Sequence, residues 1–238
     1  MQRGIWFLAC LGAILAGGLA STLSAATPSL SASPASVRAG GTVRLSGSAD
    51  GCTAGYRNEG SGFAVARGYV VTNAHVVAGT DEQAVIDGSV RLHADVVLFD
   101  PSLDIAVLHV PDLAAAPLSL DDAEVERGAG GATLGFPGGA PMRAAGAGVR
   151  RVFDATGHDI YGHGHTTRRI YELQAEVHPG NSGGPFVLPD GQVAGIVFAS
   201  SRFDPHIAYA IVSTQVVPLV QEARTLTQPA GTGPCVSG

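Results

Sequence analysis

Lysine is absent from this chain of 238 residues, and charged side chains are sparse throughout. They make up 14% of the residues, the formal net charge is −6, and no basic stripe follows any segment. Proteins that bind nucleic acid usually carry such a stripe, with which they contact phosphates. The composition therefore argues against nucleic acid as a partner. All Lys and Arg positions are arginine, and we draw no functional conclusion from this.

A long apolar run occurs only at the N-terminus, from Ile5 to Leu19. Arg3 precedes this run and Ser24-Ala25-Ala26 follows it, which is the pattern of a signal peptide with small residues at its cleavage site. Residues 1–26 are therefore predicted to be an export segment. An uncleaved membrane tether is the alternative, because Ile5 to Ala26 is just long enough to span a bilayer. Either way, the rest of the chain is expected outside the cytoplasm.

Cysteine is also scarce, with three residues in the chain. Too little hydrophobic sequence precedes Cys10 for a lipoprotein site. Cys52 and Cys235 lie near the two ends of the patterned region, and an even pair in an oxidising compartment favours a disulfide over two free thiols. On the chain-entropy model, a bridge that closes so long a loop contributes roughly 5 kcal/mol of stability.

Strand–helix–strand repeats are missing, which argues against a parallel doubly wound sheet. Residues 27–40 are rich in Ser, Pro and Ala and are typical of a flexible linker. Residues 41–238 form the predicted folded domain, in which short β-rich segments alternate with Gly, Pro or Asp. We expect an all-β fold of two consecutive antiparallel barrels, divided within residues 114–127, with one short helix over Thr214–Ala223.

The predicted strands are Thr42–Leu45, Phe63–Ala66, Tyr69–Thr72, Val90–Phe99, Ile105–Val110, Ala132–Phe136, Gly148–Phe153, Arg169–Val177, Pro185–Leu188, Gln192–Ala199 and Ile207–Val212.

Three short motifs carry chemistry. A β-branched strand ends at His75, Asp104 opens an apolar strand, and Ser182 stands inside the glycine turn 179–185. A serine hydroxyl is a weak nucleophile that needs a neighbouring base, and a carboxylate fixes the tautomer of that base. The flanking glycines allow a tight turn in which the amides of Gly180 and Ser182 point at one developing oxyanion. Each residue alone is commonplace, but together they predict a catalytic triad.

These motifs resemble those of the trypsin-like peptidase superfamily, and in particular its bacterial exported branch. Residues 72–77, 104–108 and 180–185 are similar to the matching segments of DegP-type proteases, and the likeness is closer to the mycobacterial acid-resistance periplasmic serine proteases. The resemblance covers roughly residues 42–235 and implies two six-stranded barrels and serine endopeptidase activity on protein or peptide substrates. The closer family also ties the two ends of its protease domain with a disulfide, which Cys52 and Cys235 match. No metal or organic cofactor is implied.

Two departures from these families bear on regulation. The multi-span membrane domain of the closer family is not found here, and the sequence ends before a PDZ domain of the DegP type could begin. Neither membrane regulation nor activation by a PDZ module is therefore expected.

Other functions fit less well. The turn also satisfies Gly-x-Ser-x-Gly, the nucleophile elbow of α/β-hydrolases, but that elbow needs a following helix and a later histidine, whereas Pro185 and a β-rich run follow here. A catalytically silent binding module with the protease fold is a further alternative, although all three triad positions are filled.

Two further segments carry residues with a possible function. The segment 157–165 holds His158, His163 and His165, whose spacing matches no closed zinc site, so we interpret it as a surface loop that gains charge in mild acid. Glu176, six residues before Ser182, is either the floor of a substrate pocket selective for basic residues or a solvent-facing side chain of an alternating strand.

Overall fold

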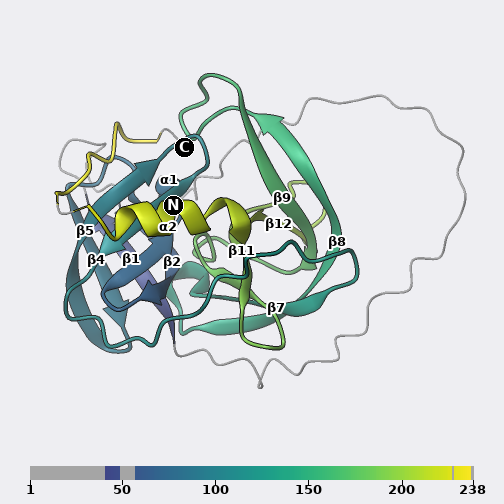
Figure 1. Cartoon of the computed structure of the whole chain (residues 1–238), viewed down its shortest axis with the longest axis horizontal. Coiled ribbons are helices and arrows are strands. Elements are labelled where there is room, and N and C mark those ends of the chain that lie inside the picture. Colours follow the sequence, from purple (N-terminus) through teal and green to yellow (C-terminus); the bar gives the residue numbers. More distant parts are fainter. Residues whose placement is uncertain (1–40, 49–56, 227, 237–238) are drawn as a thin grey trace, which may run out of the picture.

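The structure, a computed structural model, describes residues 41–48, 57–226 and 228–236. The predicted export segment, the linker and Cys52 lie outside the described residues. Two closed antiparallel barrels of six strands each stand side by side (Figure 1). The predicted fold class is therefore confirmed, including the short C-terminal helix.

The first barrel has the strand order β1-β2-β3-β6-β5-β4, with β4 closing on β1. Its strands are β1 (Thr42–Ser48), β2 (Arg57–Ala66), β3 (Tyr69–Thr72), β4 (Glu82–Asp87), β5 (Val90–Asp100) and β6 (Ile105–His109). The helix α1 (Ala74–Val77) follows β3 after one residue. The strand therefore ends at Thr72 rather than at His75 as predicted, and His75 lies in α1.

The second barrel has the order β10-β11-β12-β9-β8-β7, closed by the pairing of β7 with β10. Its strands are β7 (Gly130–Gly135), β8 (Arg143–Gly157), β9 (Thr166–Ala175), β10 (Pro185–Val187), β11 (Val193–Ser200) and β12 (Ile207–Val212). The long hairpin β8–β9 extends beyond the barrel, and residues 158–165 form its tip (Figure 1).

Three further short helical segments complete the described fold. They are η3 (Pro137–Gly139), η4 (Ser213–Gln215) and α2 (Val217–Ala223). Helix α2 lies across both barrels in Figure 1, and its Val220 and Ala223 are buried in a cluster that contains side chains of both. None of the helices in the described ranges is long and apolar enough to cross a membrane.

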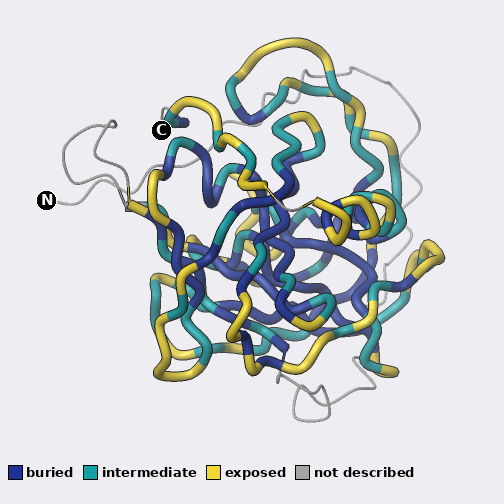
Figure 2. Tube along the Cα trace, turned by 60° about the vertical axis from the view of Figure 1, so that its left-hand side comes forward, coloured by how far each residue is buried: buried dark blue, intermediate teal, exposed yellow. Residues whose placement is uncertain are grey.

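The core contains one apolar cluster inside each barrel, one between the barrels and a small one around Ile160. Leu45, Val70 and Leu108 belong to the first barrel's cluster, and Tyr171 and Phe186 to that of the second. The shared cluster joins Phe63 of β2 to Leu134 of β7 and therefore fixes the barrels against each other. In Figure 2 the buried residues gather in the interior, and the exposed residues mark the turns.

Candidate active site

His75 and Asp104 meet on the first barrel. Nδ1 of His75 lies 2.8 Å from Oδ2 of Asp104 and 3.0 Å from Oδ1, and the amide of His75 donates to Oδ1 at 3.0 Å. The two side chains are 12% and 4% exposed. A carboxylate in this position keeps the proton on Nδ1 and leaves Nε2 as the atom that can accept a proton from a nucleophile.

Asp104 stands in a turn whose backbone is unusual. Its φ is 64°, and it is the one non-glycine residue of the described chain with a positive φ. This left-handed conformation costs an L-residue on the order of 1 kcal/mol and persists only where neighbouring groups hold it. Asn73 is one such group, since its Nδ2 donates to the carbonyl of Asp104 at 2.9 Å.

Ser182 belongs to the second barrel but lies against the first. Its carbonyl accepts a hydrogen bond from the amide of Ser61 in β2 at 2.8 Å. A Cβ on the next residue, Gly183, would collide with Oγ1 of Thr72 and would lie 3.1 Å from the amide nitrogen of Asn73. Because these two residues lead directly into His75, the fold brings all three residues of the predicted triad to the interface of the barrels.

The turn before Ser182 is held in a defined conformation. The amide of Gly138 donates to the carbonyl of Pro179 at 2.7 Å, and this bond orients the peptide unit that carries the Gly180 amide. Within the described part of the chain, the amides of Gly180 and Ser182 donate to no protein acceptor. Two unused amides in one tight turn can stabilise a negatively charged oxygen.

Gly180 cannot be exchanged for a larger residue without a change in this turn. Its φ is 97°, and a Cβ there would collide with the carbonyl oxygen of Phe136 and lie 2.8 Å from the amide nitrogen of Gly138. The glycine that sequence reasoning selected is therefore needed for both backbone angle and space.

Sequence reasoning missed Ser61, which is fully buried. Its hydroxyl donates to the carbonyl of Gly180 at 2.6 Å and accepts from the amide of Phe136 at 2.9 Å. Its own carbonyl accepts from the hydroxyl of Thr72 at 2.8 Å. Ser61 thus connects the turn of the nucleophile to the strand that leads to His75. A serine between Gly60 and Gly62 gives no sequence signal for this role, since its partners lie in other strands.

Glu176 faces solvent and does not form the floor of a buried pocket. Its side chain is 59% exposed and lies 3.1 Å from Nε2 of His178. The next residue, Val177, is buried. Glu176 follows the last residue of β9, and it is turned toward solvent between the buried Ala175 and Val177.

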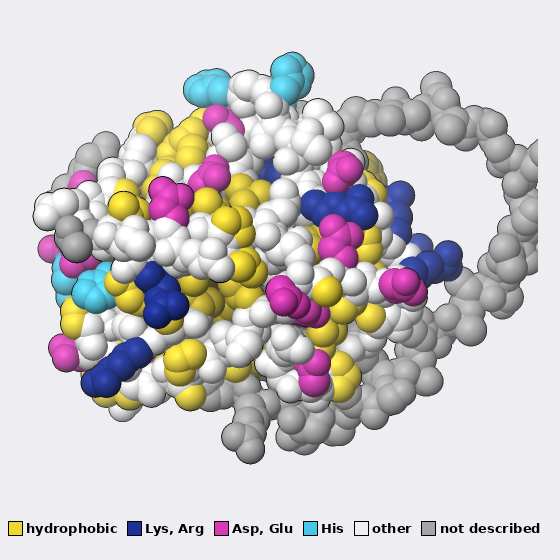
Figure 3. All heavy atoms as spheres, viewed as in Figure 1, with side chains coloured by type: hydrophobic (Ala, Val, Ile, Leu, Met, Phe, Trp, Pro, Cys, Tyr) yellow, Lys and Arg dark blue, Asp and Glu magenta, His cyan; other side chains and the backbone are white. Residues whose placement is uncertain are grey.

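The histidine segment forms the exposed tip of the β8–β9 hairpin. Histidine side chains stand out from the molecule there (Figure 3), and Nδ1 of His158 donates to the carbonyl of Gly164 at 2.7 Å. The tip packs on the turn that carries Asp104 rather than on the turn of the nucleophile, since the amide of Ile160 donates to the carbonyl of Pro101 at 3.2 Å. In the described ranges, no three His, Cys, Asp or Glu side chains form a group that could hold a metal ion.

The chain belongs to the trypsin-like peptidase family, a family of serine-type hydrolases. Residues 60–196 match the trypsin-like peptidase domain, which is more than half of the chain and includes His75, Asp104 and Ser182. Strand β10, rather than a helix, follows Ser182, so the turn is not the nucleophile elbow of an α/β-hydrolase.

Individual relatives agree with this family. The serine protease Rv3671c of Mycobacterium tuberculosis is 39% identical over 180 residues, which cover 75% of this chain and 45% of the relative. A probable periplasmic DegP-like serine endoprotease of Halomonas elongata is 33% identical over 161 residues, which cover 65% of this chain and 33% of the relative. The chain therefore spans less than half the length of these relatives.

Solved structures share the fold. The crystal structure of the Rv3671c protease from M. tuberculosis in its active form matches with a TM-score of 0.84 and 34% identity, covering 94% of this chain and 100% of the other. The HtrA-type protease AlgW with a tripeptide matches with a TM-score of 0.68 and 26% identity, covering 80% of this chain and 63% of the other.

Proposed function

We propose that this chain is a serine endopeptidase that hydrolyses peptide bonds in proteins through an acyl-enzyme intermediate. The observation that carries the proposal is the contact of His75 with both carboxylate oxygens of Asp104, next to a glycine turn with two unused amides. Such an arrangement supplies a base, an orienting group and an oxyanion site around one serine.

In the proposed mechanism, Oγ of Ser182 attacks the scissile carbonyl carbon while Nε2 of His75 takes the hydroxyl proton. The amides of Gly180 and Ser182 donate to the oxyanion as it forms. His75 then gives its proton to the leaving amine, and a water molecule activated by the same imidazole releases the acyl group. Asp104 keeps Nδ1 protonated and orients the ring throughout.

The proposal extends to the organisation of the chain. Residues 1–26 act as a signal peptide or membrane anchor, residues 27–40 as a linker, and residues 41–238 as the protease domain with its boundary between barrels at 114–127. The domain works outside the cytoplasm on protein or peptide substrates. The periplasmic DegP-like relatives and the peptide-bound AlgW structure support this location and this substrate class.

Cleavage of casein and of a peptide library by the purified chain tests the proposed function. We expect wild type to cut both and Ser182→Ala to remain folded with activity at the buffer background. His75→Ala is expected to be about as inactive, because the members of a triad act as a unit. Casein cleavage by Ser182→Ala at the wild-type rate contradicts the assignment. A folded wild type that cuts neither substrate favours a silent binding module.

A further inference from the structure

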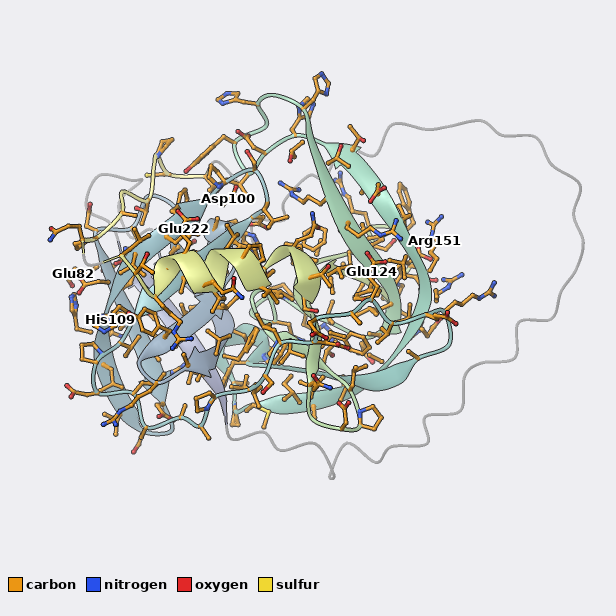
Figure 4. The ribbon with its side chains drawn as sticks, viewed as in Figure 1. Glu82, Asp100, His109, Glu124, Arg151 and Glu222 are labelled. Carbon is orange, nitrogen blue, oxygen red and sulfur yellow. The ribbon has the colours of Figure 1, made fainter. Side chains whose placement is uncertain are left out.

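The β8–β9 hairpin of the second barrel reaches the turn of the first barrel that delivers Asp104. Nε of Arg168 donates to the carbonyl of Ser102 at 2.7 Å, and Oγ1 of Thr166 donates to the same oxygen at 3.1 Å. The amide of Ile160 donates to the carbonyl of the preceding residue, Pro101. Two consecutive carbonyls of the turn are therefore bound by one hairpin. Asp100, labelled in Figure 4, begins this turn.

Arg168, which lies in β9, also binds the tip of the hairpin. Its second guanidinium nitrogen, Nη2, donates to the carbonyl of His158 at 3.2 Å. One planar side chain thus holds the base of the tip and the turn of Asp104 in a fixed relation. A fork of donors with defined geometry suits this task better than the single ammonium group of a lysine.

Ile160 adds an apolar contact to both halves of the His75–Asp104 pair. It is 9% exposed and clusters with Ala74 and Ala78, which lie at the two ends of the helix that carries His75. Phe99, from the strand before the turn, packs against the same cluster. The tip therefore contacts both the helix that carries His75 and the turn that precedes Asp104.

Asp104 itself is bound by the side chain of Asn73 and by the amide of His75, and further contacts hold the turn that precedes it. The carboxylate of Asp100 accepts from the amides of Ser102 and Leu103 at 2.8 and 2.9 Å, which closes the first half of the turn. Asp104 follows with its positive φ, a conformation that the surroundings must maintain. The hairpin contacts fall on Pro101 and Ser102, in the same turn as Asp104.

We propose that Arg168, assisted by Ile160, is a positioning residue that holds the turn 100–104 so that the carboxylate of Asp104 meets Nδ1 of His75. The second barrel thereby controls the orienting carboxylate as well as the nucleophile. This inference rests on the proposed peptidase function. A displacement of about 1 Å in a catalytic group can lower a rate by as much as about 100-fold.

Labelling of the purified full chain by a fluorescent fluorophosphonate tests the role of Arg168. We expect Arg168→Ala to lower the maximal labelling rate roughly 10- to 100-fold while the half-saturating probe concentration stays within about twofold. Arg169→Ala is the matched control, since its neighbouring side chain pairs with Glu124 and Asp154 instead. For this control, the maximal labelling rate and the half-saturating probe concentration are both expected within about twofold of the wild-type values.

A double-mutant cycle separates positioning from general destabilisation. In the Asp104→Asn background, Arg168→Ala is expected to slow labelling by no more than about twofold further, because its effect passes through Asp104. Arg168→Lys, which keeps the charge but loses the fork, is expected between wild type and Arg168→Ala. If thermal unfolding shows that Arg168→Ala does not fold, Arg168→Lys replaces it in the test and Arg169→Lys is the control.

The outcomes distinguish this inference from the proposed function. Wild-type labelling that depends on Ser182, together with equal rates in Arg168→Ala and Arg169→Ala, overturns the positioning role alone. So does a full additional loss in the Asp104→Asn background. A wild type without Ser182-dependent labelling overturns the proposed function and, with it, this inference.

Discussion

Gly180 and Gly191 have nearly the same backbone angle in different surroundings. Their φ values are 97° and 91°, but a Cβ on Gly180 would meet the backbone of Phe136 and Gly138, whereas a Cβ on Gly191 would meet nothing within 4 Å. Substitution by alanine strains the backbone at both positions. Only Gly180 also places an amide at the proposed oxyanion site.

We therefore expect Gly180→Ala to lower kcat roughly 100- to 1,000-fold, as for the loss of one oxyanion donor. Gly191→Ala is expected to keep kcat within about twofold and to lose only stability, by about 1 kcal/mol. Steady-state kinetics and thermal unfolding of both variants measure this difference. Equal kcat values in the two variants contradict the role of the Gly180 turn.

The hydroxyl of Ser61 offers a second test on one residue. Ser61→Ala leaves the carbonyl of Gly180 and the amide of Phe136 without their buried partner, so we expect a loss of about 1–3 kcal/mol in the free energy of unfolding. Because the turn of Ser182 loosens, kcat is expected to fall more than KM changes. Ser46→Ala on β1 is the control. Chemical denaturation measures the free energy of unfolding of both variants, and steady-state kinetics measure their kcat and KM. Unchanged kcat in Ser61→Ala rules out a part for its hydroxyl in the turn.

At the scale of elements, the predicted strands are found at their places in the chain, although β2 and β8 are longer than predicted. Tyr69–Thr72 and Ile207–Val212 have the predicted bounds. Strand β4 was not predicted because the polar residue Gln83 interrupts its apolar pattern. Gln83 is nevertheless buried, since its side-chain amide donates to the carbonyl and the hydroxyl of Thr80. Helix α1 was missed because four residues with two valines have low helix propensity, and only tertiary contacts hold them.

A proline lies at the start of the helix near the C-terminus. The sequence predicts one helix over Thr214–Ala223, and the structure divides this segment into η4 and α2. Pro218 lies in the first turn of α2, where the missing amide proton has no helical acceptor to lose. The proline therefore marks where the α-helix begins.

The exposed hairpin tip predicts a response of activity to mild acid. His158, His163 and His165 share the hairpin with Arg168 and with one carboxylate at the tip, Asp159, and histidine is the side chain most often used as a pH-dependent switch. Added positive charge is expected to loosen the contact with the Asp104 turn. Wild type should therefore lose a larger share of its pH 8 kcat/KM by pH 5.5 than the triple His→Gln variant.

His93→Gln is the control for this comparison, because His93 is an exposed histidine of the first barrel. Its pH–rate profile is expected to follow that of wild type. Superimposable profiles for wild type and the triple variant leave the hairpin tip without a part in the acid response.

At the scale of the whole molecule, the sequence predicts both barrels and the triad but not how the barrels support each other. The motifs at His75, Asp104 and Ser182 are local and could be read directly. The contacts of Ser61 with Gly180, and of Arg168 with Ser102, join residues 119 and 66 positions apart. No periodicity or turn signal marks such pairs, because their partners become neighbours only once both barrels have closed.

The predicted bridge between Cys52 and Cys235 also acts on the whole molecule. The described C-terminal segment packs on the end of α1, where the amide of Gly79 donates to the carbonyl of Thr232 at 3.1 Å. We expect neither cysteine to be alkylated in native protein from outside the cytoplasm. Reduction is expected to destabilise the fold by about 3–5 kcal/mol, seen as a lower Tm.

The double variant Cys52→Ser/Cys235→Ser provides the reference for this measurement. Its Tm is expected to be low and indifferent to reductant. Alkylation of both thiols in the native wild-type protein contradicts the bridge.

The most direct test of the central claim is the position of a fluorophosphonate adduct on the full chain. A triad with Ser182 as nucleophile predicts one stoichiometric adduct, found by peptide mass mapping at Ser182. It also predicts that labelling is abolished in Ser182→Ala and falls near background in His75→Ala. An adduct on another residue, or labelling that persists in Ser182→Ala, would contradict the account.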